Sequence, residues 1–104
     1  MNEPGAKADA AQVRDNPALH RFELTLGGHT AFAEYKRKPG TITFVHTVVP
    51  DELGGRGVGS ALARGALDQV RRTGEKVIAK CPFIAAFIKK NTPYQDLLAD
   101  PTSL

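Results

Sequence analysis

Alternating apolar and polar residues predict three strands in the first half of the chain, over residues 21–26, 29–36 and 41–49. The apolar positions of the first strand are Phe22, Leu24 and Leu26. Gly27-Gly28 and Pro39-Gly40 fall between these segments and are typical of turns. Because the turns are short, we expect the three strands to run antiparallel.

A period of three to four residues between apolar positions predicts two helices in the second half. The first covers residues 58–73 and ends before Gly74, which is a common helix stop. A short apolar strand over residues 76–81 follows, and Pro82 suits the first position of a second helix. Residues 94–98 are expected to form a last helical turn.

The order of these elements indicates an α+β fold built on a mixed α/β sheet. The strand–helix–strand unit over residues 41–81 should be a right-handed crossover with roughly parallel strands. Residues 1–17 show no clear period, and we expect them to form a flexible N-terminal tail. Residues 18–104 are enough for one compact domain.

Composition narrows the class of protein and of ligand. The 104 residues are 41% hydrophobic and 24% charged, as in ordinary globular proteins, and no apolar stretch is long enough to cross a membrane. The N-terminus lacks a signal-peptide pattern and Cys81 is the single cysteine, so we expect a cytoplasmic location. The net charge of +3 suits an anionic ligand, but it does not by itself indicate nucleic acid.

A glycine-rich run between a predicted strand and a predicted helix is the strongest functional signal in the sequence. It consists of Gly54, Gly55, Arg56, Gly57, Val58, Gly59 and Ser60. Glycines let the backbone approach a ligand, and the unpaired N–H groups at a helix start attract phosphate. The Walker pattern is excluded because no lysine stands between Gly59 and Ser60, and the dinucleotide pattern fails at Ser60, where its last glycine should be.

Residues 48–62 resemble the acetyl-CoA motif of the GNAT superfamily of N-acetyltransferases. That motif reads Gln/Arg-x-x-Gly-x-Gly/Ala between a strand and a helix. Gly57 and Gly59 match its two small positions, whereas Gly54 stands where Gln or Arg is usual. Arg56, two residues later, is available to supply the missing charge.

The resemblance covers residues 20–98 and is strongest with the short single-domain branch of the superfamily. Its other matching pieces are Arg21-Phe22-Glu23, Ala33-Glu34-Tyr35, His46-Thr47, Val49-Pro50, Lys80-Cys81-Pro82-Phe83 and Pro93 with Leu97. In this family the pyrophosphate of acetyl-CoA rests on backbone amides of the glycine turn, and the pantetheine arm pairs with the preceding strand. The resemblance therefore implies a compact GNAT-like fold that holds acetyl-CoA through residues 54–60 and through Thr47, Val48 and Val49.

Two side chains are candidates for the chemistry of transfer to a primary amine, which must lose its proton before it attacks. His46 lies upstream of the glycine run and suits a general base, or it is a histidine held by hydrogen bonds within a sheet. Cys81 ends a strand just before a helix start, which suits a nucleophile or acyl carrier, although free cysteines are often small buried apolar residues. By resemblance, Tyr94 could protonate the leaving thiolate, with packing as its alternative role.

The remaining candidates are residue types that commonly serve solvation. The alternative bases are Glu23, Glu34 and Glu52. Lys89 and Lys90 are either a solvated helix face or a contact to the ribose phosphate of the cofactor. His20 and His29 have no acidic or cysteine partners at metal-ligand spacing, so no metal site is expected.

The sequence thus predicts an acetyl-CoA-dependent N-acetyltransferase that acts by direct attack of the amine or via Cys81. The chain lacks the two helices that usually follow the first strand in this superfamily. The acceptor site should therefore be open or completed by a partner, which favours a protein or peptide amine. The alternative is a CoA-binding regulatory or interaction module with little catalytic activity, because no acid–base pair is obvious. A nucleic-acid binder would rest on modest basic charge alone.

Overall fold

One five-stranded sheet organises the fold, in a computed structural model that describes residues 8–100 and 102. Its strands, in order across the sheet, are β1 (Arg14–Asn16), β2 (Arg21–Leu26), β3 (His29–Lys38), β4 (Thr41–Val48) and β5 (Lys76–Ala79). The first four strands pair antiparallel, whereas β4 and β5 pair parallel. The predicted α+β fold with a mixed sheet is confirmed, including the parallel crossover.

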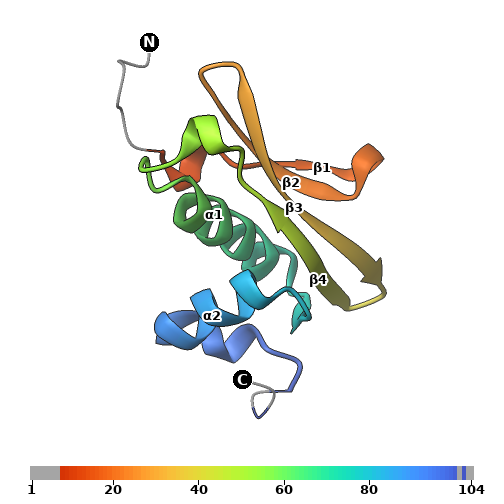
Figure 1. The fold of residues 1–104 in the computed structure, drawn as a ribbon. Helices are drawn as coiled ribbons and strands as arrows, with labels where there is room; N and C mark the ends of the chain where they lie inside the picture. Colours follow the sequence, from red (N-terminus) through yellow and green to blue (C-terminus); the bar gives the residue numbers. More distant parts are fainter. Residues whose placement is uncertain (1–7, 101, 103–104) are drawn as a thin grey trace.

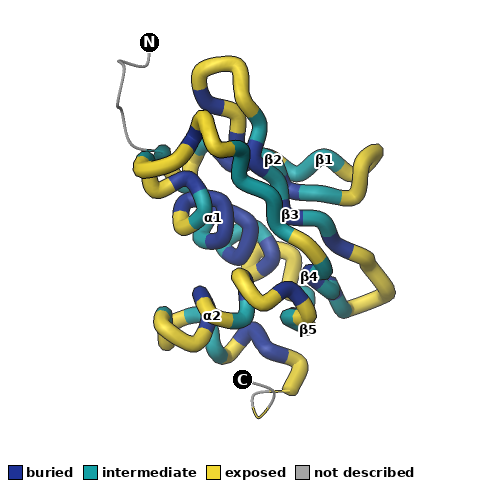
Figure 2. The backbone as a smooth tube through the Cα atoms, viewed as in Figure 1, coloured by how far each residue is buried: buried dark blue, intermediate teal, exposed yellow. Residues whose placement is uncertain are grey.

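Two helices, α1 (Val58–Thr73) and α2 (Pro82–Lys90), lie beside each other next to this sheet (Figure 1). The described residues also form four short 3₁₀ helices: η1 (Ala10–Gln12), η2 (Pro17–Leu19), η3 (Asp51–Leu53) and η4 (Thr92–Leu97). Buried residues gather between α1 and the sheet (Figure 2). We call the sheet face that carries Phe22, Ala33 and Phe44 the inner face, and the face that carries Phe32 and Glu34 the outer face.

The helix boundaries match the sequence closely. α1 covers the predicted residues 58–73, and Gly74 closes it in a left-handed conformation with φ of 78°. α2 begins at Pro82, as predicted. The last strand is shorter than the predicted 76–81, because the N–H groups of Lys80 and Cys81 both donate to the carbonyl oxygen of Phe44. None of the described helices is long and apolar enough to span a membrane.

The N-terminal segment is ordered where we expected a flexible tail over residues 1–17. Residues 10–16 form η1 and β1, and Asp9 and Gln12 close η1 with reciprocal side-chain-to-backbone hydrogen bonds. Val13 is 5% exposed and packs against Gly65 of α1. The prediction is therefore wrong for residues 8–17, and residues 1–7 lie outside the described part of the chain.

A β-bulge interrupts the alternation of β4. Glu34 pairs with His46, and Tyr35 pairs with Phe44, so Val45 is an extra residue with no partner on β3. Because of this extra residue, His46 lies on the outer face opposite Glu34, and Thr47 lies on the inner face opposite Ala33. The bulge thus decides which side chains of β4 face which side near its end.

Candidate functional site

The glycine turn, residues 54–60, leads from η3 into α1 and presents its backbone to solvent. Gly55 and Gly57 have φ of 76° and 68°, a left-handed conformation that side-chain-bearing residues rarely adopt. A Cβ at either position would meet nothing within 4 Å. Gly57 is the N-cap of α1, and no side chain caps that end. The first turn of α1 can therefore donate hydrogen bonds to an anion.

Gly59 differs from Gly55 and Gly57, because a neighbouring side chain packs closely against it. A Cβ at this position would lie 2.8 Å from Cζ of Phe83, the second residue of α2. The starts of the two helices therefore approach each other at Gly59. Val58 is buried in the core with 2% exposure, and Ser60 is exposed.

The position where the family pattern expects Gln or Arg does not carry a cation in this structure. Gly54 is exposed, and a Cβ there would lie 3.2 Å from the carbonyl oxygen of Asp51. Arg56 extends toward the β2–β3 turn, since its Nη1 lies 3.9 Å from the position of a Cβ at Gly27. The glycine turn thus offers backbone N–H groups as its main donors.

The end of β4 has a free edge that leads toward this turn. β5 pairs with β4 only as far as Phe44, and the chain then leaves the sheet to begin α2. Residues 45–48 of β4 therefore have no partner on β5. Thr47 Oγ1 lies 3.2 Å from Cys81 Sγ at the place where the two strands part. An extended ligand could pair with this edge as an added strand.

The predicted residues of β4 fall on both faces of the sheet. Val48 pairs with Phe32 on the outer face, whereas Val49 packs against the core. His46 is exposed on the outer face, and Cys81 is 2% exposed on the inner side. The structure brings Thr47 and Cys81 together, but it does not bring His46 and Cys81 together as a pair.

The structure places Glu34 next to another candidate residue, which the sequence alone did not indicate. The sequence makes it one of three alternative bases, and the structure places it directly opposite His46. Directly opposed residues in antiparallel strands have neighbouring side chains. Had the bulge at Val45 been recognisable from the sequence, it would have revealed this pair. Of the other two, Glu23 is held by Arg21 Nε at 2.6 Å, and Glu52 is exposed in η3.

The Tyr94 side chain packs against α1 and α2, at a distance from the glycine turn. Its hydroxyl donates to Asp68 Oδ1 at 2.8 Å, and its ring packs on Phe87 at 5.7 Å between centroids. Asp68 lies ten residues beyond Val58 on α1, which is about 15 Å along the helix axis. Burial and the hydrogen bond to Asp68 raise the pKa of Tyr94, so its proton is held more tightly.

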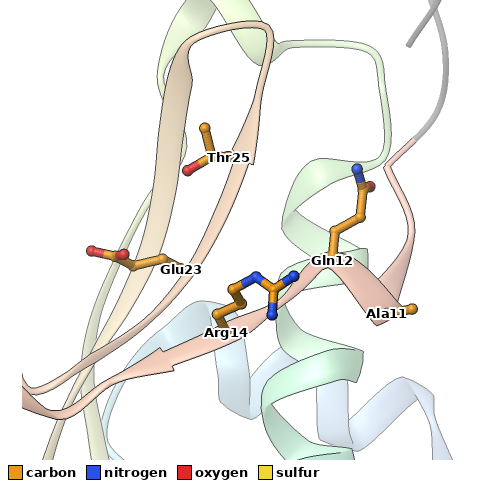
Figure 3. A pocket seen from close by; sticks show the side chains of 5 residues that line it. All are labelled: Ala11, Gln12, Arg14, Glu23 and Thr25. Carbon is orange, nitrogen blue, oxygen red and sulfur yellow. The ribbon is translucent and has the colours of Figure 1, made fainter. Parts of the chain in front are cut away.

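A depression near β1 and β2 carries no comparable chemistry (Figure 3). Gln12 and Glu23 line it, but both side chains are already engaged. Gln12 Oε1 accepts from the Asp9 N–H at 2.7 Å, and Glu23 accepts from Asn16 and Arg21. Its Gln12 and Glu23 side chains are satisfied within the chain, so we do not consider it a candidate site.

A sequence model described as GCN5-related N-acetyl-transferase matches residues 21–97 of this chain. The chain belongs to the GCN5-related N-acetyltransferase family. The match spans all the elements from β2 to η4 that build the glycine turn and the free edge of β4. The resemblance seen in the sequence is thereby confirmed.

Known proteins of similar sequence and structure agree with the family. The chain is 37% identical to Protein NATD1 of Xenopus tropicalis over 88 residues, which cover 81% of this chain and 80% of that protein. It is 32% identical to Protein NATD1 of Bos taurus over 94 residues, covering 85% and 82%. A GCN5-like putative N-acetyltransferase from Staphylococcus aureus, solved by NMR, matches with a TM-score of 0.64 and 29% identity, covering 83% and 85%.

Proposed function

We propose that this chain transfers an acetyl group from acetyl-CoA to a primary amine. The observation that carries the proposal is that the unpaired edge of β4 leads, through η3 and the glycine turn, to the uncapped start of α1. The pantetheine arm would pair with that edge at Thr47 and Val48, and the pyrophosphate would accept hydrogen bonds from the glycine turn. The open space at Gly55 and Gly57 fits such a close approach.

Direct attack on the outer face is the route that the placement of His46 supports best. When bound, acetyl-CoA supplies a thioester carbonyl that a neutral amine can attack. His46 would take the proton from an amine that arrives at the outer face, and Glu34 opposite would stabilise the charged imidazole. A free N–H on the edge of β4 would donate to the carbonyl oxygen as negative charge develops there.

Cys81 offers the alternative route, because its sulfur lies where β4 and β5 part. In this route its thiolate attacks the thioester carbonyl and the CoA thiol leaves. The amine then attacks the acetyl-cysteine and restores the thiol. The low exposure of Cys81 means that the residues around its sulfur must move first.

The acceptor that we propose is a protein or peptide amine. Among the described residues no α-helix covers the outer face near His46, which is itself exposed, so the acceptor would reach it from open solvent. A bulky acceptor fits an open face better than an enclosed pocket. The cytoplasmic location stays a prediction from the sequence.

Calorimetric titration with acetyl-CoA, followed by an amine acetylation assay, tests the proposal. Gly57→Ala should bind acetyl-CoA at least about tenfold more weakly than the parent chain, because alanine strains the turn that must donate to the pyrophosphate. Gly40→Ala is the matched control, because Gly40 also has a positive φ, 79°, and open space around it, but it lies in the β3–β4 turn. Absence of binding at millimolar acetyl-CoA would overturn the proposal. Binding without transfer would favour the regulatory module.

A further inference from the structure

Residues 8–13, which we call the N-terminal brace, connect β1 with the glycine turn. The Ala8 N–H donates to the carbonyl oxygen of Arg56, a residue of the glycine turn, at 2.9 Å. Ala8 also packs against the edge of the core. The family model begins at residue 21, so the brace lies outside the part of the chain that it matches. The function proposed above gives this segment no role.

The other end of the brace is fixed on α1, and Figure 1 shows η1, its helical part, beside the start of that helix. Val13 is buried, and its carbonyl oxygen accepts from Gln69 Nε2 at 2.9 Å. Gly65 leaves the space that the brace fills, because a Cβ there would lie 2.5 Å from the carbonyl oxygen of Ala10. Glycine weakens the interior of a helix, so this close approach is a physical reason for a glycine at this position of α1.

The brace is held together internally between its two attachments. The Asp9 carboxylate accepts from the Ala11 N–H at 2.9 Å, and Gln12 Oε1 accepts from the Asp9 N–H at 2.7 Å. The Val13 N–H donates to the carbonyl oxygen of Ala10 at 3.1 Å. The docking of η1 on α1 therefore determines where the Ala8 N–H lies.

The glycine turn needs such support, because its own residues restrain it weakly. Gly55 and Gly57 have positive φ, and no side chain caps the start of α1 at Gly57. Glycine loses more conformational freedom than any other residue when its backbone is fixed. A ligand that had to order this turn would bind more weakly by that cost, whereas a turn that is held in advance spares it.

We propose that the N-terminal brace holds the glycine turn in the conformation that binds the pyrophosphate of acetyl-CoA, and that the hydrogen bond from Ala8 to Arg56 is the link. This inference rests on the proposed function. The brace acts through the turn, so its residues are positioning residues. Their contribution belongs to the affinity for acetyl-CoA and not to the rate of the chemical step.

Ala8→Pro in the full chain tests the link, because proline has no N–H to donate to Arg56. We expect the Kd and the KM for acetyl-CoA to rise about fivefold, the effect of one hydrogen bond, with kcat within about twofold of the parent. Ala10→Pro is the matched control. Ala10 is the first residue of η1, a position that accepts proline, and this variant should bind acetyl-CoA like the parent.

Gly65→Ala tests the same inference from the other end, because the added Cβ forces the brace away from α1. It should also raise the Kd for acetyl-CoA several-fold. Gly40→Ala is its control, since it strains a distant turn with φ of 79° and should lower stability without changing the Kd. Calorimetric titration gives each Kd together with the fraction of chain that binds. If Gly65→Ala does not fold, Gln69→Ala, which removes the bond to Val13, takes its place.

The inference requires a loss of affinity at both ends of the brace. The parental Kd in either Ala8→Pro or the α1 variant overturns it, leaves the brace with a role in stability alone, and leaves the proposed function standing. Equal losses in the two control variants also overturn it, because general destabilisation then explains the effect. Failure of the parent chain to bind acetyl-CoA overturns both this inference and the proposed function.

Discussion

Thr47 Oγ1 lies 3.2 Å from Cys81 Sγ, and this contact joins β4 to the start of α2 where β4 and β5 part. The thiol is thereby held against the strand edge that we propose for the pantetheine arm. Because Cys81 is 2% exposed, it can react only after the residues that cover it move. His46 needs no such change, since it is exposed on the outer face.

We predict that Cys81→Ala acetylates an amine within about threefold of the parent rate, because direct attack on the outer face does not use the thiol. Initial rates with a lysine peptide measure this, and intact-protein mass spectrometry after incubation with acetyl-CoA shows whether Cys81 becomes acetylated. Acetylation of Cys81 at the turnover rate, together with loss of transfer in the variant, would assign the acyl-carrier role to it.

His46→Ala should lower kcat about 100-fold, the usual contribution of a general base, with little effect on the KM for acetyl-CoA. Glu34→Gln should lower kcat less, since it removes only the charge that faces the imidazole. His29→Ala is the control, because His29 is exposed at the start of β3 and pairs with Leu26 at the far end of the hairpin. Equal rates for His46→Ala and His29→Ala would exclude His46 as the base.

Two glycines of α1 should respond differently to alanine. A Cβ at Gly65 would lie 2.5 Å from the carbonyl oxygen of Ala10 and even closer to Val13, so the N-terminal segment would have to move. We expect Gly65→Ala to lower the free energy of unfolding by about 1–3 kcal/mol. At Gly59 the nearest atom is the far end of the partly exposed Phe83 ring, which can rotate away.

Gly59→Ala should therefore stay within about 1 kcal/mol of the parent, helped by the better helix propensity of alanine. Urea denaturation of both variants measures the difference. Similar stabilities would contradict the packing of η1 and Val13 against α1.

Tyr35 should make stability fall at alkaline pH. Burial and its hydrogen bond to Asp15 raise the pKa of Tyr35 to about 12, from an ordinary value of 10.0. The folded chain thus keeps a proton that the unfolded chain releases. The resulting stabilisation is complete below pH 10 and is lost as the pH rises toward 12.

Tyr35→Phe should accordingly flatten the fall in unfolding free energy over that range. At pH 7 it should cost about 2 kcal/mol, because the buried hydroxyl no longer donates to a carboxylate. Urea denaturation at pH 7 and at several values between 10 and 12 measures both effects. Parallel pH curves for the parent and the variant would refute the assignment.

Periodicity predicted most of the fold because the long elements bury one face each. The period of two in β2 and the stripe on α1 reflect contacts within one core, and the side chains of Phe22 and Leu62 are almost fully buried. The glycine turn was recognisable for a related reason. Its left-handed residues must be glycines, so the backbone conformation is visible in the sequence.

Two features could not be predicted because they depend on contacts between distant residues. β1 has only three residues, and its pairing with β2 gives no alternation that a sequence pattern could show. The approach of Phe83 to Gly59 depends on how α2 packs against α1, which the pattern of either segment alone does not show.

The unpaired Val45 has a consequence for how this strand can change during evolution. His46 and Thr47 owe their faces to the number of residues before them and not to their own chemistry. Removing one residue at the bulge would exchange the two faces, and every side chain from there to the end of β4 would turn over. At this strand, gain or loss of a single codon would therefore alter the site more than most substitutions.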